Sequence, residues 1–441
     1  MKFANLDEWL TCLESRHPKK IDLGLDRVRR VAERMELLGQ AATVVTVAGT
    51  NGKGSFVKTL STLLLADDAR VGCYTSPHLI HYNERITVNG QNATDRAICE
   101  AFEAIEEARD DISLSYFEFG TLAALYVFKE AKLDYIILEV GLGGRLDAVN
   151  IVDADISVIT SIGIDHEDWL GSDREDIGLE KAGILRYGQP FICVDDAIPH
   201  SIKARAEELA CKAYWLGEQI HIDQSSSATL VACQLPASET KSISDATVIT
   251  QTKVAREKIQ FQFAESYVPL PSIAAALQCY CLQRDSDTTE NTEKISSLVQ
   301  SVRLEGRYET LASDGYRFIL DVAHNPQAAV HLAATLISRG NGDLIAIFAC
   351  MQDKNLAGIV EPLLPLIRHW VCVDIPGMDR SRSGEQLAED IRKLGGSAQS
   401  EITPELGLEG AKRVKASADQ TILVFGSFYL LAEIKPLLEE S

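Results

Sequence analysis

Apolar residues near the start of the chain follow first a helical and then a strand spacing. Residues 6–16 and 25–38 each place apolar side chains on one face of a 3.6-residue period, which predicts two helices. Residues 43–49 form a β-branched run that ends in glycine, and the helical pattern of 56–68 follows it. The order of strand, glycine loop and helix predicts the start of an α/β fold with a buried strand.

The same rhythm continues along the chain. Further helices are predicted at 94–109, 117–131, 201–212 and 272–283. Further strands are predicted within 133–144, 154–166, 190–196, 316–326, 343–354, 369–376 and 421–431. Strands that alternate with helices favour parallel sheets that are covered on both faces. We therefore expect an α/β protein: an N-terminal, P-loop-type, mostly parallel sheet flanked by helices, and a smaller, Rossmann-like α/β domain at the C-terminus.

Two segments interrupt this rhythm. Residues 223–256 are rich in Ser and Thr and alternate over short pieces, so we expect either a small antiparallel addition or a loose surface insert. Residues 285–293 are polar and acidic without periodicity, which predicts a surface loop near a domain boundary. We place the larger domain at 1–299 and the second domain at 300–441.

Composition and charge narrow the class of protein. The chain has 441 residues, of which 46% are hydrophobic and 24% charged, the balance of a globular protein of two or three domains. Its net charge of −21 argues against nucleic acid or an anionic membrane as the main partner. The ten scattered cysteines contain no CxxC, and no apolar run approaches the roughly 18 residues of a spanning helix. We expect a cytoplasmic protein that binds small molecules.

The segment 47–55, VAGTNGKGS, carries the strongest chemical signal. Glycines let several backbone N–H groups converge on one anion, the following helix adds its N-terminal dipole, and Lys53 supplies a positive charge. The strict GxxxxGK[ST] pattern is not met, because Val47 replaces its first glycine and Gly54 its Ser/Thr. The alternative is a glycine-rich turn without a ligand. A dinucleotide fingerprint in GLGGRLD is disfavoured, because Leu146 stands where glycine is needed.

Polar side chains follow several predicted strands at the end where α/β sheets bind ligands. They are Ser76, Glu139, Asp165 and His166. Oxygen ligands suit Mg²⁺, and a carboxylate in an apolar strand is costly to bury unpaired, which favours a metal or base role for Glu139. On residue type alone, His166 stays open between a ligand and a structural histidine.

Two further places stay open on the residues alone. Lys181, next to Glu180, indicates only a surface lysine. Asp321, His324 and Asn325 end a predicted strand and indicate a helix-capping cluster or a binding site.

Eight motifs together resemble those of a known family. VAGTNGKGS, SPHL with NERI, YFEFGTLAAL, ILEVGLGGRLDA, SIGIDHEDWLG, EKAGI, LEGRYE and LDVAHNP occur in this order between about residues 6 and 431. Their order resembles the Mur ligase superfamily, and in particular its folate branch, whose bifunctional members carry a segment like HPKKIDLGLDRV. The resemblance covers nearly the whole chain.

The resemblance implies an ATP-dependent ligase that adds L-glutamate to 7,8-dihydropteroate and further glutamates to reduced folates. ATP phosphorylates a carboxylate to an acyl phosphate, which the amine of glutamate attacks. Electrostatic stabilisation of the transferring phosphoryl group and positioning carry such a reaction. The resemblance implies ATP as co-substrate, Mg²⁺ as two ions and room for a monovalent cation. Separately from the resemblance, we expect a monomer.

It also assigns roles to residues at matching motif positions. Thr50, Asn51, Gly52, Lys53, Gly54 and Ser55 match the phosphate loop. Ser76, Glu139 and His166 match magnesium ligands, and Lys181 matches the lysine that these ligases carbamylate. The expected catalytic residues are Lys53, Glu139, His166 and Lys181. The nucleotide positions are Ser272, Arg307, Asp321 and the nearby His324. The pterin-substrate positions are Lys20, Ile21, Asp22, Leu23, Ser115, Tyr116, Phe117, Glu118, Leu146, Asp147 and Ala148.

The chain departs from the family pattern at two positions. Ser272 stands where the family usually has Asn, and Val149 where it has Thr. Two other functions remain as alternatives. A ligase that adds an amino acid to a UDP-muramoyl precursor would share the phosphate loop but would not need the IDLGLDR and YFE segments. A P-loop ATPase or small-molecule kinase would form no amide.

Overall fold

The chain folds into two compact α/β units. The computed structural model describes residues 3–19, 21–225, 228–235, 258–284, 291–378, 380–414 and 420–439. The first unit comprises 1–78, 83–164 and 170–302, and the second comprises 79–82, 165–169 and 303–441. The predicted fold class, a parallel-rich N-terminal sheet and a C-terminal α/β domain, is confirmed. The sequence pattern did not show that the short segments 79–82 and 165–169 belong to the second unit.

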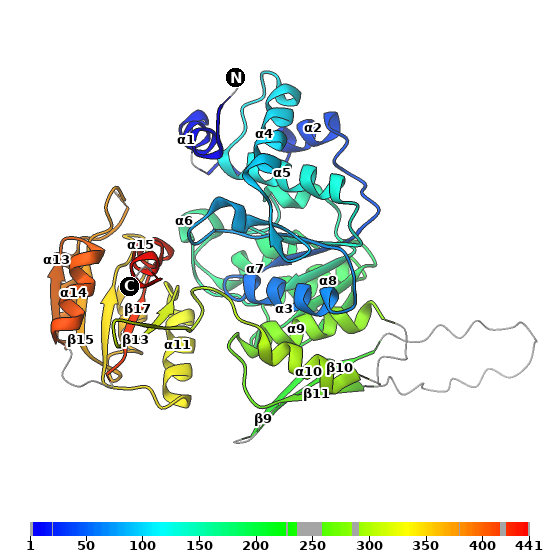
Figure 1. Ribbon diagram of the computed structural model, residues 1–441. Coiled ribbons are helices and arrows are strands. Elements are labelled where there is room, and N and C mark those ends of the chain that lie inside the picture. Colours follow the sequence, from blue (N-terminus) through cyan, green and yellow to red (C-terminus); the bar gives the residue numbers. More distant parts are fainter. Residues whose placement is uncertain are drawn as a thin grey trace, which may run out of the picture. The chain divides into compact units, whose positions relative to one another are not determined.

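The first unit is built on an eight-stranded sheet with the order β4-β3-β2-β5-β1-β6-β7-β8 (Figure 1). Six strands are parallel: β1 (Thr43–Ala48), β2 (Val71–Tyr74), β5 (Tyr135–Glu139), β6 (Ile156–Ile159), β7 (Pro190–Cys193) and β8 (Lys212–Trp215). The edge strands β3 (Ile86–Val88) and β4 (Gln91–Asn92) are antiparallel. Strand β1 lies between β5 and β6, so the loop that follows it leaves the middle of the sheet.

Helices surround this sheet. They are α1 (Leu6–Arg16), α2 (Asp26–Arg34), α3 (Lys53–Leu65), α4 (Asp95–Arg109), α5 (Tyr116–Ala131), α7 (Arg174–Ala182), α8 (His200–Glu208), α9 (Leu270–Leu282) and α10 (Thr292–Ser301). The short helices are η1 (Tyr82–Arg85) and η2 (Ala148–Ile151), whereas α6 (Glu167–Leu170) lies mostly in the segment 165–169 that groups with the second unit. Helix α3 begins three residues before its predicted start, because Gly52 adopts a left-handed conformation, with φ of 87°, and ends the preceding loop there.

A small antiparallel sheet lies beyond α9 and α10 in Figure 1. It has the order β11-β10-β9, with β9 (His221–Gln224), β10 (Thr229–Gln234) and β11 (Lys258–Phe263). Alternate residues of β11 are buried, as the period of a one-faced strand requires. The predicted antiparallel addition is present in β9 and β10, while 226–227 and 236–256 lie outside the described residues.

The loop predicted at 285–293 needs a correction at its end. Residues 292–293 already belong to α10, and 285–290 lie outside the described residues. Helix α10 packs on β11 and α3, so tertiary contact overrides the polar composition of its first turn.

The second unit is built on a six-stranded sheet with the order β12-β13-β17-β14-β15-β16. Its strands are β12 (Glu309–Ser313), β13 (Tyr316–Asp321), β14 (Leu344–Phe348), β15 (Ile367–Val373), β16 (Ala398–Glu401) and β17 (Ile422–Phe425), and only β12 is antiparallel. Its helices are α11 (Pro326–Ser338), α12 (Leu356–Val360), α13 (Gly384–Lys393), α14 (Pro404–Val414) and α15 (Phe428–Glu439). Alternate residues of β14 enter two separate hydrophobic cores, so the sheet is buried on both faces.

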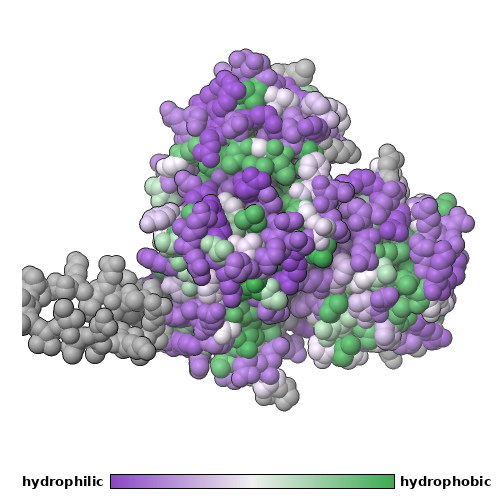
Figure 2. Space-filling view, turned by 180° about the vertical axis from the view of Figure 1, so that it is seen from behind, coloured by the Kyte–Doolittle hydropathy of each residue, from purple (hydrophilic) through white to green (hydrophobic). Residues whose placement is uncertain are grey.

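The outer surface is mostly polar. On the face seen in Figure 2, hydrophilic residues predominate in both units and apolar patches lie among them. In the part of the chain that the structure describes, no helix combines the length and the apolar composition that crossing a membrane would need.

Candidate active site

Four neighbouring strands of the first unit end at the same edge of the sheet. Glu139 is the last residue of β5, Ser76 lies two residues after β2, and the loop 49–52 follows β1. Residues 160–161 follow β6, the next strand across. Because carboxyl ends of parallel strands form the binding edge of an α/β sheet, the phosphate loop and these candidate ligands share one edge.

Hydrogen bonds from the loop after β6 hold the phosphate loop in place. The backbone N–H of Thr50 donates to the Ser161 carbonyl at 2.7 Å, and that of Asn51 donates to Ser161 Oγ at 3.0 Å. Lys53 Nζ donates to the carbonyl of Gly49 at 3.0 Å, so the ammonium folds back over the loop. The loop is therefore formed in the protein itself, with the lysine above it, as a phosphate site requires.

Helix α9 also contacts this loop. Ser272 Oγ donates to the Gly52 carbonyl at 3.0 Å, and the Ser272 side chain is buried. A methyl group added at Gly52 would overlap Ser272 Oγ, so only glycine fits both the left-handed backbone and the approach of α9.

The polar groups at this edge fit a hard cation. Glu139 is buried, and Ser55 Oγ is buried without a hydrogen-bond partner among the described residues. Within the described ranges, no group of three or more His, Cys, Asp and Glu side chains could hold a metal ion by itself. A Mg²⁺ ion here would complete its shell with a hydroxyl, water and phosphate oxygens, which is its usual preference.

Lys181 is buried, with 3% of its surface exposed, so the expectation of a surface lysine from residue type is wrong. It lies in the last turn of α7, whose Glu180 carbonyl accepts from the backbone N–H of Arg145 at 2.8 Å. Arg145 also forms an ion pair with the Glu180 carboxylate at 2.7 Å. These contacts hold the last turn of α7 against the glycine loop after β5.

Three segments expected to contact the pterin substrate lie together. The backbone N–H of Gly24 donates to the Leu146 carbonyl at 3.2 Å. Arg27 forms an ion pair with Asp22 at 2.9 Å and another with Glu118 at 3.2 Å, the second outside hydrogen-bond geometry. Lys20 lies outside the described residues.

Several residues of this cluster also have a local structural role. Ser115 and Glu118 form a capping box at the start of α5, with the Ser115 N–H donating to Glu118 Oε2 at 2.7 Å. Asp147 accepts from the backbone N–H groups of Gly141 and Leu142 at 3.0 and 2.9 Å. Burial raises the pKa of Asp147 to about 6, although these N–H groups oppose the shift.

Aromatic rings lie beside this cluster. The ring centroids of Tyr74 and Phe117 are 5.7 Å apart, and a methyl group at Gly141 would overlap the Phe117 ring. The guanidinium of Arg85 lies 5.6 Å from the ring centroid of Tyr116. The pair Tyr116 and Phe117 is half-buried, so each ring keeps a surface that a flat ligand ring could contact.

In the second unit, two of the residues expected to bind nucleotide, Arg307 and His324, lie beside Phe428. The Arg307 guanidinium is 5.4 Å from the Phe428 ring centroid, and the His324 ring is 6.0 Å from it. Asp321 accepts from the backbone N–H of Tyr308 at 2.9 Å. Burial raises the pKa of Asp321, with Arg307 opposing the shift, and burial lowers the pKa of His324 to about 4.

Asn325 has the capping role that residue type suggested. Its side chain accepts from the backbone N–H of Ala328 at 2.9 Å at the start of α11. His166 lies in the segment 165–169 of the second unit, and its backbone is left-handed with φ of 56°.

Two family models match the chain. The Mur ligase middle domain matches residues 47–260, and the Mur ligase glutamate ligase domain matches residues 306–428. The dihydrofolate synthase/folylpolyglutamate synthase of Escherichia coli K12 is 40% identical over 435 residues, which are 98% of this chain and 96% of the relative. The chain belongs to the dihydrofolate synthase/folylpolyglutamate synthase family of Mur ligases. The family resemblance and the class of ATP-dependent ligase expected from the ordered motifs are confirmed.

Solved structures of the family have the same fold. E. coli FolC in complex with DHPP and ADP has a TM-score of 0.87 at 39% identity and covers 99% of this chain and 98% of its own. A bifunctional folylpolyglutamate synthase/dihydrofolate synthase with Mn, AMPPNP and L-glutamate bound has a TM-score of 0.85 at 38% identity, with the same coverage.

The sequence did not identify some residues that contact the candidate site. Ser161 holds the phosphate loop, and Gly24 and Arg27 join segments that are expected to contact the pterin substrate. Gly24 and Arg27 belong to IDLGLDR, so the motif was recognised while these positions within it were not assigned. Ser161 likewise begins the motif SIGIDHEDWLG, but its contact with the phosphate loop depends on the pairing of β1 with β6, which the motif alone does not give.

Proposed function

We propose that the chain adds L-glutamate to 7,8-dihydropteroate and further glutamates to reduced folates, in both cases with ATP and through an acyl phosphate. The observation that carries this proposal is the convergence of the IDLGLDR, Ser115–Glu118 and Leu146–Ala148 segments in the unit that holds the phosphate loop. The similarity over nearly the whole length of the E. coli relative supports it.

Lys53 and the loop N–H groups bind the phosphates of ATP in this proposal. A carboxylate is a poor electrophile at neutral pH, so its conversion to an acyl phosphate requires stabilisation of the transferring phosphoryl group. The Lys53 ammonium, held over the loop by the Gly49 carbonyl, lies where it can stabilise the negative charge on the transferring phosphoryl group. Ser272 fixes the Gly52 peptide of the same loop.

Ser76, Glu139 and His166 would hold the divalent ions, for which we propose two sites and room for a monovalent cation. When bound, Mg²⁺ would neutralise charge on the phosphate oxygens. The buried Lys181 would carry a carbamate, which turns a costly buried cation into an anion. Glu139 and His166 act with Lys53 and Lys181 as the catalytic set.

The second unit contributes Arg307, Asp321 and His324 to nucleotide binding. The Arg307 guanidinium lies 5.4 Å from the centroid of the Phe428 ring, within reach of a cation–π contact, and the two together offer an aromatic and cationic surface to an adenine ring. With the functional boundary at 299/300, residues 1–299 would carry phosphate and pterin binding, and 300–441 would contact nucleotide and glutamate. We propose that the working form is a monomer, which light scattering of the purified protein would measure.

The test uses purified protein with ATP, Mg²⁺, labelled L-glutamate and either 7,8-dihydropteroate or a reduced folate, with products separated by mass. Formation of dihydrofolate and of polyglutamate products supports the proposal. Release of phosphate that does not depend on glutamate would instead favour an ATPase or kinase. Activity only with a UDP-muramoyl acceptor would favour the cell-wall ligase.

A further inference from the structure

A buried ion pair joins Asp165, which follows a predicted strand, to Lys354, a residue to which the sequence assigned no role. Lys354 Nζ donates to Asp165 Oδ1 at 2.5 Å, and the two side chains are 8% and 9% exposed. The residues are 189 positions apart in the chain, yet both belong to the second unit, because the segment 165–169 groups with it. A buried charge that loses its partner is strongly destabilising, so this pair is expected to hold its two segments firmly together.

The Asp165 carboxylate has three further contacts. The backbone N–H of His166 donates to Oδ1 at 2.9 Å, and Asn325 Nδ2 donates to Oδ2 at 3.4 Å. His324 Nε2 lies 3.8 Å from Oδ2. Asn325 is itself fixed as the N-cap of α11. A carboxylate with this many neighbours acts as an anchor for the peptide that it contacts.

The anchored peptide is the one that carries His166. Its left-handed backbone is uncommon for a residue other than glycine and persists only where the surroundings hold it. The bond from the His166 N–H to the neighbouring carboxylate fixes this peptide, and Lys354 fixes the carboxylate. The pair thus helps to hold the backbone from which the His166 side chain projects.

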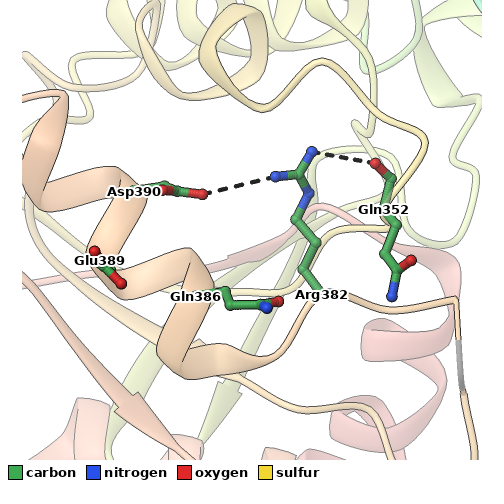
Figure 3. A pocket seen from close by; sticks show the side chains of 5 residues that line it. All are labelled: Gln352, Arg382, Gln386, Glu389 and Asp390. Atoms are coloured by element: carbon green, nitrogen blue, oxygen red, sulfur yellow. Dashed lines mark hydrogen bonds and ion pairs between the residues drawn. The ribbon is translucent and has the colours of Figure 1, made fainter.

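The loop that carries Lys354 is fixed in turn by Arg382, which lies just before α13. Arg382 Nη2 donates to the backbone carbonyls of Gln352 and Lys354, both at 3.2 Å. In Figure 3, Arg382 lies between Gln352 and Asp390. These three residues line a surface cavity of about 370 Å³. The backbone N–H of Gln352 also donates to the Arg380 carbonyl at 2.8 Å.

We propose that Lys354 is a positioning residue for the ligase reaction. Through Asp165 it fixes the peptide that presents His166, and Arg382 fixes the Lys354 loop. Lys354 acts through another residue and need not touch substrate. The inference rests on the proposed function, because it gives His166 its role at the metal.

The test compares Lys354→Met, Asp165→Asn and the double variant with the unaltered protein. The matched control is Lys412→Met, which removes another ion-paired lysine of the second unit, 3.1 Å from Asp314. The first readout is hydrogen–deuterium exchange of the peptide 163–170 in metal-free, nucleotide-free protein. The second is the Mg²⁺ concentration for half-maximal activity at saturating ATP and glutamate.

Both single variants are expected to exchange faster at 163–170 and to need about 10- to 100-fold more Mg²⁺, the usual effect of losing a group that orients a metal ligand. The double variant is expected to be no more than about threefold worse than the worse single variant, because both remove one interaction. Lys354→Arg, which keeps the charge, is expected to keep both the exchange rate at 163–170 and the Mg²⁺ requirement close to those of the unaltered protein. The control is expected to match the unaltered protein.

Three outcomes would overturn the proposal. Unchanged exchange at 163–170 in both single variants would show that the pair does not hold the peptide. Additive effects in the double variant would separate the roles of Lys354 and Asp165. A rise in the KM for glutamate alone, in Lys354→Met but not in Asp165→Asn, would make Lys354 a substrate contact. An unaltered protein without ligase activity would contradict the proposed function instead, while the exchange readout would still report on the pair.

Discussion

Ser272 Oγ and the carbonyl oxygen of Gly52 are 3.0 Å apart, although the residues are separated by 220 positions in the chain. Ser272 lies at the start of α9, and its hydroxyl fixes the last peptide of the phosphate loop before α3. The position that we expect to depart from the family pattern is therefore in direct contact with the loop.

Replacement of Ser272 by Ala is expected to raise the KM for ATP about 3- to 10-fold, the effect of losing one hydrogen bond of about 0.5–1.5 kcal/mol. The fold should persist, because the change removes one hydroxyl. Steady-state kinetics with ATP varied would measure the effect. Ser157→Ala is the matched control, since Ser157 is also buried and donates to a carbonyl, that of Ile184, at 2.9 Å. An equal rise in both variants would indicate general loosening of the unit.

Lys53→Ala is expected to lower kcat by about three orders of magnitude or more, because a positioned cation on the transferring phosphoryl group is lost. Thermal stability should change little, since Lys53 Nζ donates to the carbonyls of Gly49 and Thr50 in its own loop. Single-turnover assays and a melting curve test this. Lys58→Ala, at an exposed position of the same helix, should leave turnover intact. Normal glutamate addition by the Lys53 variant would remove the phosphate-loop role.

Most of the fold could be predicted from the period of apolar residues. The strand 43–49 and the helices 6–16 and 94–109 were placed within one residue of their observed bounds, because a continuous β-branched run and a one-sided helical face have few other solutions. Predicted strands such as 133–144 were too long, since they included the glycine loop after β5.

The candidate site was less predictable, because its contacts join segments that are distant in the chain. Lys181 has the sequence surroundings of a surface residue, and only packing of the α7 turn buries it. Segment 165–169 groups with the second unit although the residues on both sides of it belong to the first, and the local sequence contains no pattern that predicts this. Ordered family motifs identified individual residues, but not the contacts among them.

Lys181→Ala is expected to reduce turnover strongly and to recover part of it when a small carboxylate such as acetate is added. The reason is that a carbamate at this buried position would be an anion, which a soluble carboxylate can replace. Intact-protein mass spectrometry under bicarbonate would detect the added CO₂. Lys203→Ala, at an exposed position of α8, should need no rescue. Absence of rescue together with an unmodified lysine would contradict carbamylation.

Arg27→Met is expected to raise the KM for 7,8-dihydropteroate about 10-fold, the loss associated with a hydrogen bond to a charged group. Arg27 joins Asp22 to Glu118, so its removal should separate two of the three pterin segments. The KM for ATP should not change, because Arg27 contacts Asp22 and Glu118, which lie outside the phosphate loop. Arg30→Met, an exposed arginine on the same helix, is the control. A rise in both KM values would show that the variant disturbs the whole unit.

Glu106 of α4 forms ion pairs with two arginines, and one of them, Arg16, belongs to α1. Its carboxylate accepts two bonds from Arg16, both at 2.6 Å, and two from Arg109, at 2.7 and 2.8 Å. Burial acts to raise the pKa of Glu106, but the hydrogen bonds and charges of Arg109 and Arg16 lower it to about 2. The pKa in the folded chain is thus below that of the unfolded chain, which is about 4.3.

A group with a lowered pKa in the folded state stabilises the protein above its unfolded pKa and loses that effect as the pH falls through its folded pKa. Glu106→Gln is therefore expected to cost about 1 kcal/mol at pH 7, a value discounted for partial exposure to solvent, and progressively less between about pH 4 and pH 2. Urea unfolding at pH 7 and near pH 3 would measure the difference. Glu107→Gln, at an exposed position of the same helix, should change stability at neither pH. An effect of Glu106→Gln that stays constant down to pH 2 would mean that packing, and not the ion pairs, holds α1 against α4.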